Sequence, residues 1–139
     1  MLKVVIDANV WISSLWGDGK PRRIRERFER DEFQLVFAQE LLDECQEVLA
    51  RPKFAQRIDA NQAALVLELI RCRATFVQLP PAIPSISQDP DDDKYLVCAE
   101  LGSCDFLVSG DPDLLDVGTY RNTKIVTPAD FLTVLEASE

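Results

Sequence analysis

The chain opens with Leu2-Lys3-Val4-Val5-Ile6-Asp7-Ala8-Asn9, and this stretch decides the fold. Its short apolar run is rich in β-branched residues and ends at an acid, which predicts a buried strand with Asp7 at its exit. A second stretch, Phe106-Leu107-Val108-Ser109-Gly110-Asp111, follows the same plan. A carboxylate at the end of a buried strand is unfavourable unless something neutralises it, so both acids need a physical reason.

Apolar runs alternate with helical patterns along the rest of the chain. Strands are predicted over 2–7, 34–37, 75–78, 105–109 and 124–126. Helices are predicted over 20–30, 39–50, 60–73, 90–101 and 128–137, with a short helical turn over 112–116. The helix over 60–73 is expected to be largely buried. This alternation predicts an α/β fold with three layers, in which a central parallel sheet lies between helices and binds ligands at the carboxyl ends of its strands.

Length and composition indicate a single domain over residues 1–139. No apolar stretch approaches the roughly 18–20 residues that span a bilayer, and the first apolar run is too short for a signal peptide, so we expect a cytoplasmic protein without a membrane partner. The net charge of −9 argues against broad nucleic-acid binding through overall charge. It leaves room for a local basic patch, because six of the fifteen basic residues lie within 20–30.

The chain has no histidine, so the usual general base and the usual zinc ligand are both missing. Its four cysteines lack CxxC spacing and are expected to be reduced, buried thiols; they are Cys45, Cys72, Cys98 and Cys104. Carboxylates and a hard divalent cation are the remaining economical means of catalysis.

Acids on two predicted helices join Asp7 and Asp111 as candidates. On the helix over 39–50, Glu44 lies about 40° outside the apolar stripe, closer to it than the neighbouring acids, when each residue turns the helix by ~100°. The Asp89-Pro90-Asp91-Asp92-Asp93 run opens the next helix, where the helix dipole favours acids but three consecutive acids repel one another. Helix geometry does not single out one member of that run.

Each acid also has a purely structural explanation. Asp7 suits a helix N-cap, Glu44 suits a boundary position that reaches water, and Asp111 before Pro112 suits a turn. Taken together, carboxylates from separate elements at one sheet edge favour a site for divalent cations, because they cannot all be ionised side by side without them. Two such ions roughly 4 Å apart are used to hydrolyse phosphodiesters.

The order of these motifs resembles a PIN-domain ribonuclease over almost the whole chain. The resembling segments are Val4–Val10, Leu41–Phe54, Asp91–Ala99 and Phe106–Leu115. The resemblance implies that the metal ligands and catalytic residues are Asp7, Glu44, Asp93 and Asp111, supported by Asn9, Ser109 and Asp113. It prefers Asp93 over Asp92 only through the family's spacing. Ala38 departs from the family, which commonly has a small hydroxyl residue there, and Trp11 and Trp16 stand where smaller aliphatic residues are usual.

The resemblance further implies a function, which we take as the expectation for this chain. It is a Mg²⁺- or Mn²⁺-dependent endoribonuclease that hydrolyses single-stranded RNA with one or two ions. The nearest subgroup is the toxin components of bacterial toxin–antitoxin systems, which implies a cognate antitoxin and a homodimer. The basic segment is open to three interpretations: Arg23, Arg27 and Arg30 contact RNA, dock an acidic antitoxin segment, or form a solvated helix face.

Two other classes of protein fit parts of the pattern. An aspartyl-phosphate enzyme or phosphoacceptor domain also places an Asp after its first strand beside Mg²⁺. Its dehalogenase-like form requires a second Asp where this chain has Asn9, and its receiver form requires a Lys that closes a late strand, whereas Lys124 opens one. A non-catalytic PIN-like interaction module normally lacks one or more of the acids, and this chain keeps all four.

Overall fold

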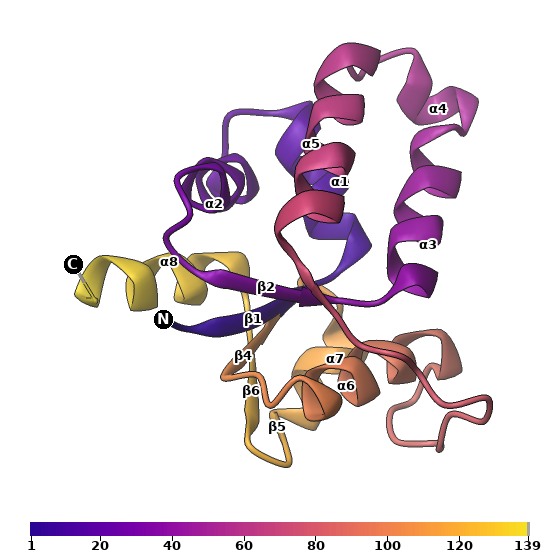
Figure 1. Cartoon of the computed structure of the whole chain (residues 1–139), viewed down its shortest axis with the longest axis vertical. Coiled ribbons are helices and arrows are strands. Elements are labelled where there is room, and N and C mark those ends of the chain that lie inside the picture. Colours follow the sequence, from indigo (N-terminus) through magenta and orange to yellow (C-terminus); the bar gives the residue numbers. More distant parts are fainter. Residues whose placement is uncertain (139) are drawn as a thin grey trace.

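The computed structural model describes residues 1–138 and has three layers, with a sheet between two sets of helices (Figure 1). The sheet order is β3-β2-β1-β4-β6-β5. Its strands are β1 Lys3–Ile6, β2 Gln34–Phe37, β3 Thr75–Phe76, β4 Phe106–Val108, β5 Thr119–Tyr120 and β6 Thr123–Val126. All neighbouring pairs are parallel except β5 with β6, so the predicted three-layer α/β/α fold is confirmed, with one short antiparallel strand at its edge.

Helices cover both faces of this sheet. Figure 1 shows α1, α3 and α5 above the sheet and α6 and α7 below it, while α8 packs against α2. The helices are α1 Ala8–Trp16, α2 Lys20–Glu29, α3 Gln39–Leu49, α4 Pro52–Ala55, α5 Ala60–Arg73, α6 Pro90–Leu101, α7 Pro112–Val117 and α8 Pro128–Ala137. Within residues 1–138, none of them combines the length and apolar character needed to cross a bilayer.

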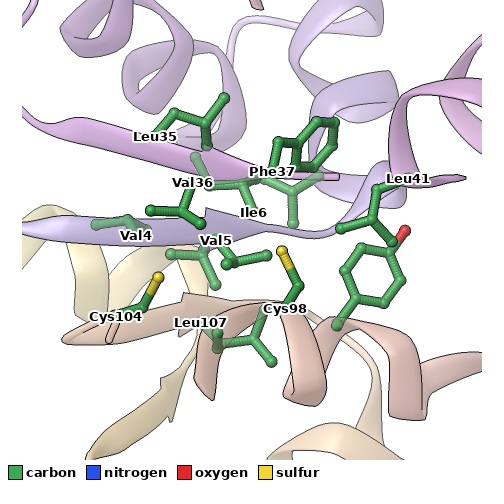
Figure 2. Packing of buried hydrophobic residues seen from close by; sticks show 14 of the residues in the cluster. Val4, Val5, Ile6, Leu35, Val36, Phe37, Leu41, Cys98, Cys104 and Leu107 are labelled. Carbon is green, nitrogen blue, oxygen red and sulfur yellow. The ribbon is translucent and has the colours of Figure 1, made fainter. Parts of the chain in front are cut away.

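The first strand is the centre of the hydrophobic core. Val4, Val5 and Ile6 have no exposed surface, as expected for a strand covered by helices on both faces. Figure 2 shows Val5 packed with Cys98 and Leu107 on one side of this strand. These contacts remove the strand from water, so whatever follows it is held at a fixed place.

Two predictions about local structure were wrong. Cys72 is exposed, whereas the other three cysteines are buried as expected. The helix α5 is not largely buried: it presents Ala63, Val66 and Ile70 to the core, and Leu65 is 70% exposed. Its apolar residues run around the whole helix, and tertiary contacts cover only one face.

The elements missing from the prediction are α1, α4 and β5. The α1 helix begins directly after β1, without a turn that would separate the two in the sequence. Its start depends on Asp7, whose Oδ1 accepts hydrogen bonds from the backbone N–H groups of Asn9 at 2.7 Å and Val10 at 3.2 Å. This cap satisfies donors that a helix otherwise leaves unpaired.

The α6 helix ends at its C-cap, Gly102, where its backbone lies close to β2, so this position should not tolerate a larger residue. A Cβ atom on Gly102 would overlap the side chain of Val36, which is buried in β2. We expect Gly102→Ala to lower the free energy of unfolding by roughly 1–3 kcal/mol, the usual range for overpacking a core. Urea unfolding measures this change. Gly17→Ala is the control, because a Cβ there meets nothing within 4 Å; equal stability of the two variants would contradict the packing described.

Candidate metal centre

The carboxyl ends of β1 and β4 bring two of the predicted acids together. The strands pair in parallel with Ile6 opposite Val108, and the backbone N–H of Asp7 donates to the Val108 carbonyl at 3.1 Å. The Ser109 hydroxyl donates to Asp7 Oδ2 and accepts the backbone N–H of Asp111 at 3.0 Å. One buried hydroxyl therefore links the residues that follow the two strands.

Asp7 is 4% exposed and has both carboxylate oxygens occupied by hydrogen bonds. Burial raises the pKa of Asp7, although hydrogen bonds from Ser109, Val10 and Asn9 pull the pKa down in part. The Asp111 carboxylate adds to the rise. Asp7 is therefore the N-cap of α1, as its structural explanation predicted. The cap does not explain why a second acid, Asp111, lies close to Asp7.

The acidic cluster, defined here as Asp89, Asp92 and Asp111, lies beside Asp7. One carboxylate oxygen of each residue lies within 4.8 Å of those of the other two. Asp92 is 9% exposed, and its buried Oδ2 has no hydrogen-bond partner within residues 1–138. Burial, with help from the nearby Asp111 carboxylate, raises the pKa of Asp92 to about 7. A cation bound beside Asp92 would therefore lower its pKa and favour the ionised carboxylate.

Asp93 is held away from the acidic cluster. Its Oδ1 accepts the Ser87 backbone N–H and hydroxyl, each at 2.7 Å, and its Oδ2 accepts the Ile86 N–H at 3.1 Å. Burial acts to raise the pKa of Asp93, but the hydrogen bonds from Ser87 and Ile86 outweigh it and lower the pKa. The structure thus brings Asp92 to the neighbourhood of Asp111 and ties Asp93 to the loop before α6.

Glu44 is connected to the start of α1 through a tyrosine that the sequence analysis missed. The Tyr95 hydroxyl donates to Glu44 Oε1 and accepts the Ala8 backbone N–H, both at 3.1 Å, and Lys94 forms an ion pair with Glu44 Oε2. Burial raises the pKa of Tyr95 well above its ordinary value, so the hydroxyl stays protonated as a donor. The sequence did offer a signal for Tyr95, because it lies in the first turns of the helix that begins with the acidic run.

Asn9 and Asp113, two of the supporting residues predicted from the sequence, lie in surroundings that differ from each other. Asn9 is exposed and lines an open cleft of about 470 Å³ together with Glu44 and Lys94. Asp113 contributes its backbone N–H, which donates to Asp111 Oδ1 at 2.9 Å. The cleft continues past Glu44 to Arg51 and Phe54; of the predicted ligands only Glu44 lines it.

The residues present fit a hard divalent cation. Ionised carboxylates only accept hydrogen bonds, and oxygen donors are what Mg²⁺, Mn²⁺ and Ca²⁺ prefer. The unpartnered Asp92 Oδ2 supplies a ligand atom that no neighbouring donor uses. The acidic cluster could therefore bind a metal ion, with Asp7 held beside it.

The basic helix lies on another side of the molecule. Arg23, Arg27 and Arg30 line a hollow of about 200 Å³ that they share with Leu132 and Glu136 of α8. Arg27 also pairs with Glu32 at 2.8 Å. Figure 1 shows α2 and α8 on the left and α3 on the right, so these arginines are separated from Glu44.

Comparison with known proteins identifies the family of this fold. A family model described as PIN domain matches residues 3–113, and the chain belongs to this family. PIN domains are typically metal-dependent nucleases that act on RNA. The crystal structure of PAE2754 from Pyrobaculum aerophilum superposes with a TM-score of 0.61 at 18% identity, covering 98% of this chain and 90% of that chain, which supports the fold. No curated protein matches the chain.

Replacing Asp92 tests its position in the cluster. The folded protein keeps a proton on Asp92 up to about pH 7, whereas the ordinary pKa is 3.8, so the metal-free protein loses stability as pH rises through this window. The neutral side chain of Asp92→Asn avoids this loss. We expect its Tm in EDTA to exceed the parent's by roughly 2–6 °C at pH 8 and to match it near pH 4. Mn²⁺ should raise the Tm of the parent and leave that of Asp92→Asn unchanged.

Asp93→Asn is the matched variant, and it should lower the stability of the metal-free protein at pH 8, where Asp92→Asn raises it. Its lowered pKa means that ionised Asp93 stabilises the fold above the ordinary pKa of 3.8 and that this contribution is lost as pH falls. The variant should lose roughly 1–3 kcal/mol of stability at pH 8 and still gain stability from Mn²⁺. A Mn²⁺ response lost in Asp93→Asn and kept in Asp92→Asn would reverse the assignment.

Ser109 should control how well the acids hold a cation. Ser109→Ala removes the donor to Asp7 Oδ2 and the acceptor for the Asp111 backbone N–H, so both residues are held less firmly at the sheet edge. We expect Mn²⁺ affinity measured by titration calorimetry to fall about 10–100-fold. Ser14→Ala is the control, because its buried hydroxyl donates to the Trp11 carbonyl and not to a carboxylate. Equal affinities in the two variants would rule out the role given to Ser109.

Proposed function

We propose that the protein is a metal-dependent endoribonuclease that hydrolyses phosphodiester bonds of single-stranded RNA. The observation that carries this proposal is the acidic cluster at the carboxyl edge of the sheet, with Asp7 tied to Asp111 through Ser109. Membership of the PIN-domain family supports the reaction class. The open cleft that begins at Glu44 and Asn9 provides room for a substrate strand.

The proposed ligands are Asp7, Glu44, Asp92 and Asp111, with Asp89 at the rim of the site. We choose Asp92 as the third ligand instead of Asp93, which the family's spacing suggested. The reason is that Asp92 Oδ2 has no hydrogen-bond partner within residues 1–138. When bound, Mg²⁺ or Mn²⁺ lowers the pKa of a water molecule and stabilises negative charge on the phosphodiester oxygens. The protein's part is to hold the carboxylates at fixed positions.

The side chains around the ligands have distinct tasks in this proposal. Ser109 orients Asp7 and Asp111, and Tyr95 holds Glu44 against the start of α1. Lys94 neutralises one charge of the site through its ion pair with Glu44. Because the chain has no histidine, proton transfer during cleavage goes through water and a carboxylate.

The biological setting belongs to the same proposal. By its resemblance to the toxin components of toxin–antitoxin systems, the protein would act in the cytoplasm as a homodimer and be inhibited by a cognate antitoxin. The basic face formed by Arg23, Arg27 and Arg30 is the proposed contact for an acidic antitoxin segment, since it lies apart from the acidic cluster. A small DNA-binding protein encoded directly upstream would support this setting.

Asp7→Asn is the decisive variant for the reaction. Loss of its charge weakens cation binding at the centre of the site, so we expect cleavage of single-stranded RNA in Mn²⁺ or Mg²⁺ to fall at least about 100-fold. Asp59→Asn is the control. Asp59 caps α5 through Asn61 and Gln62 as Asp7 caps α1, but it lies outside the site, and Asn keeps the cap in both variants. A gel assay of labelled RNA with and without metal measures the effect.

Three results would contradict the proposal. If Asp7→Asn cleaves RNA as fast as the parent in Mg²⁺, the assigned site is wrong. If the parent binds Mn²⁺ but cleaves no RNA, the acidic cluster belongs to an interaction module instead. A mass shift from phosphorylation at Asp7 would indicate a phosphoacceptor domain.

A further inference from the structure

A group of aromatic and basic side chains lies around Phe54, which lines the cleft. Trp16 ends α1 with 40% of its surface exposed, and its ring contacts that of Phe54 edge-on, with centroids 5.5 Å apart. Arg57 lies 5.0 Å from the Trp16 ring centre, and Lys53 lies 5.5 Å from the Phe54 ring centre. We call this group, Trp16, Lys53, Phe54 and Arg57, the aromatic platform.

The charge of the platform sets it apart from the rest of the protein. The chain carries 24 acidic and 15 basic residues, so most exposed cations can find a carboxylate. Across residues 1–138, however, Lys53 and Arg57 form no ion pair, whereas the nearby Arg51 pairs with Glu47. Two cations on an exposed Trp16 ring and a half-buried Phe54 ring, without acidic partners, suit an anionic ligand with flat apolar groups.

One cleft connects the platform, through Phe54, with the proposed ligand Glu44. Phe54 lines the same cleft as Asn9 and Glu44, and this cleft also contains Arg51 and Lys94. The α1 helix joins the two ends, because it begins directly after Asp7 and ends at Trp16, with a rise of about 13 Å. A short single-stranded segment can span that distance with one end at each site.

We propose that the aromatic platform is a subsite that stacks a nucleobase of single-stranded RNA while a flanking phosphodiester lies at the carboxylates. The inference rests on the proposed nuclease function and names how its substrate is held. Bases stack on aromatic rings without regard to sequence, and cations beside the rings track the backbone. On binding, the base replaces the Arg57 guanidinium on Trp16, and the exposed, flexible Arg57 side chain turns to a phosphate.

RNA affinity tests the platform independently of cleavage. The parent and Trp16→Leu are titrated into fluorescein-labelled oligouridylate in Ca²⁺ buffer, and fluorescence anisotropy gives the Kd. Ca²⁺ prefers the same oxygen ligands as Mg²⁺. We expect Trp16→Leu to bind roughly 5- to 150-fold more weakly, the range for loss of one stacked base, and Trp16→Phe to recover most of the affinity. Phe76→Leu, which removes an exposed ring from β3, should bind as the parent does.

A second probe separates stacking from a structural role. An oligonucleotide of equal length with abasic sites offers the same charge without bases. The parent should bind it as weakly as Trp16→Leu binds oligouridylate, and Trp16→Leu should bind both probes equally. A variant that merely loosened the fold would weaken binding of both probes alike.

The outcomes distinguish this inference from the proposed function. If the parent cleaves RNA and Trp16→Leu binds oligouridylate as tightly as the parent, the platform is not an RNA subsite and the nuclease proposal stands. If affinity depends on Trp16 but the parent cleaves no RNA, the subsite stands and the nuclease proposal fails. If the parent binds no RNA, the subsite is overturned, and a protein partner becomes the better candidate for the aromatic platform.

Discussion

The parallel pairing of β1 with β4 is the constraint on which the rest of the site depends. It sets Ile6 opposite Val108, so the residues that leave the two strands begin side by side at the same edge of the sheet. Ser109 then joins Asp7 to the Asp111 backbone through one buried hydroxyl. Because β1 is covered on both faces, this edge cannot shift without disturbing the core.

The same edge concentrates charge that the fold alone does not neutralise. Asp7 offsets its burial by capping α1, and Asp93 does so through Ser87 and Ile86. Asp92 has no such compensation, and its pKa is raised accordingly. This contrast separates Asp93, whose oxygens are occupied by the loop before α6, from Asp92, whose Oδ2 is available to a ligand. Residues that reduce stability in the absence of a ligand are expected at functional sites.

How far the sequence could be interpreted depended on the kind of signal. Strands with apolar runs and helices with clear periodicity were predicted correctly, because buried positions are occupied by apolar residues at the spacing of each element. The α1 helix was missed because it starts without a turn, and α5 was judged too buried because its apolar residues do not show which face meets the core. Within the site, Asp7 and Asp111 were placed at the sheet edge correctly, since strand ends follow from chain order.

The sequence by itself determined the α/β class, the order of the elements and the set of acids from which a cation site can be built. Only the tertiary structure decided which acids meet. Asp92 and Asp93 are neighbours at the start of one helix, but successive side chains on a helix point in directions about 100° apart. One therefore faces Asp111 and the other faces the loop at Ser87, and that difference depends on how α6 packs against the sheet.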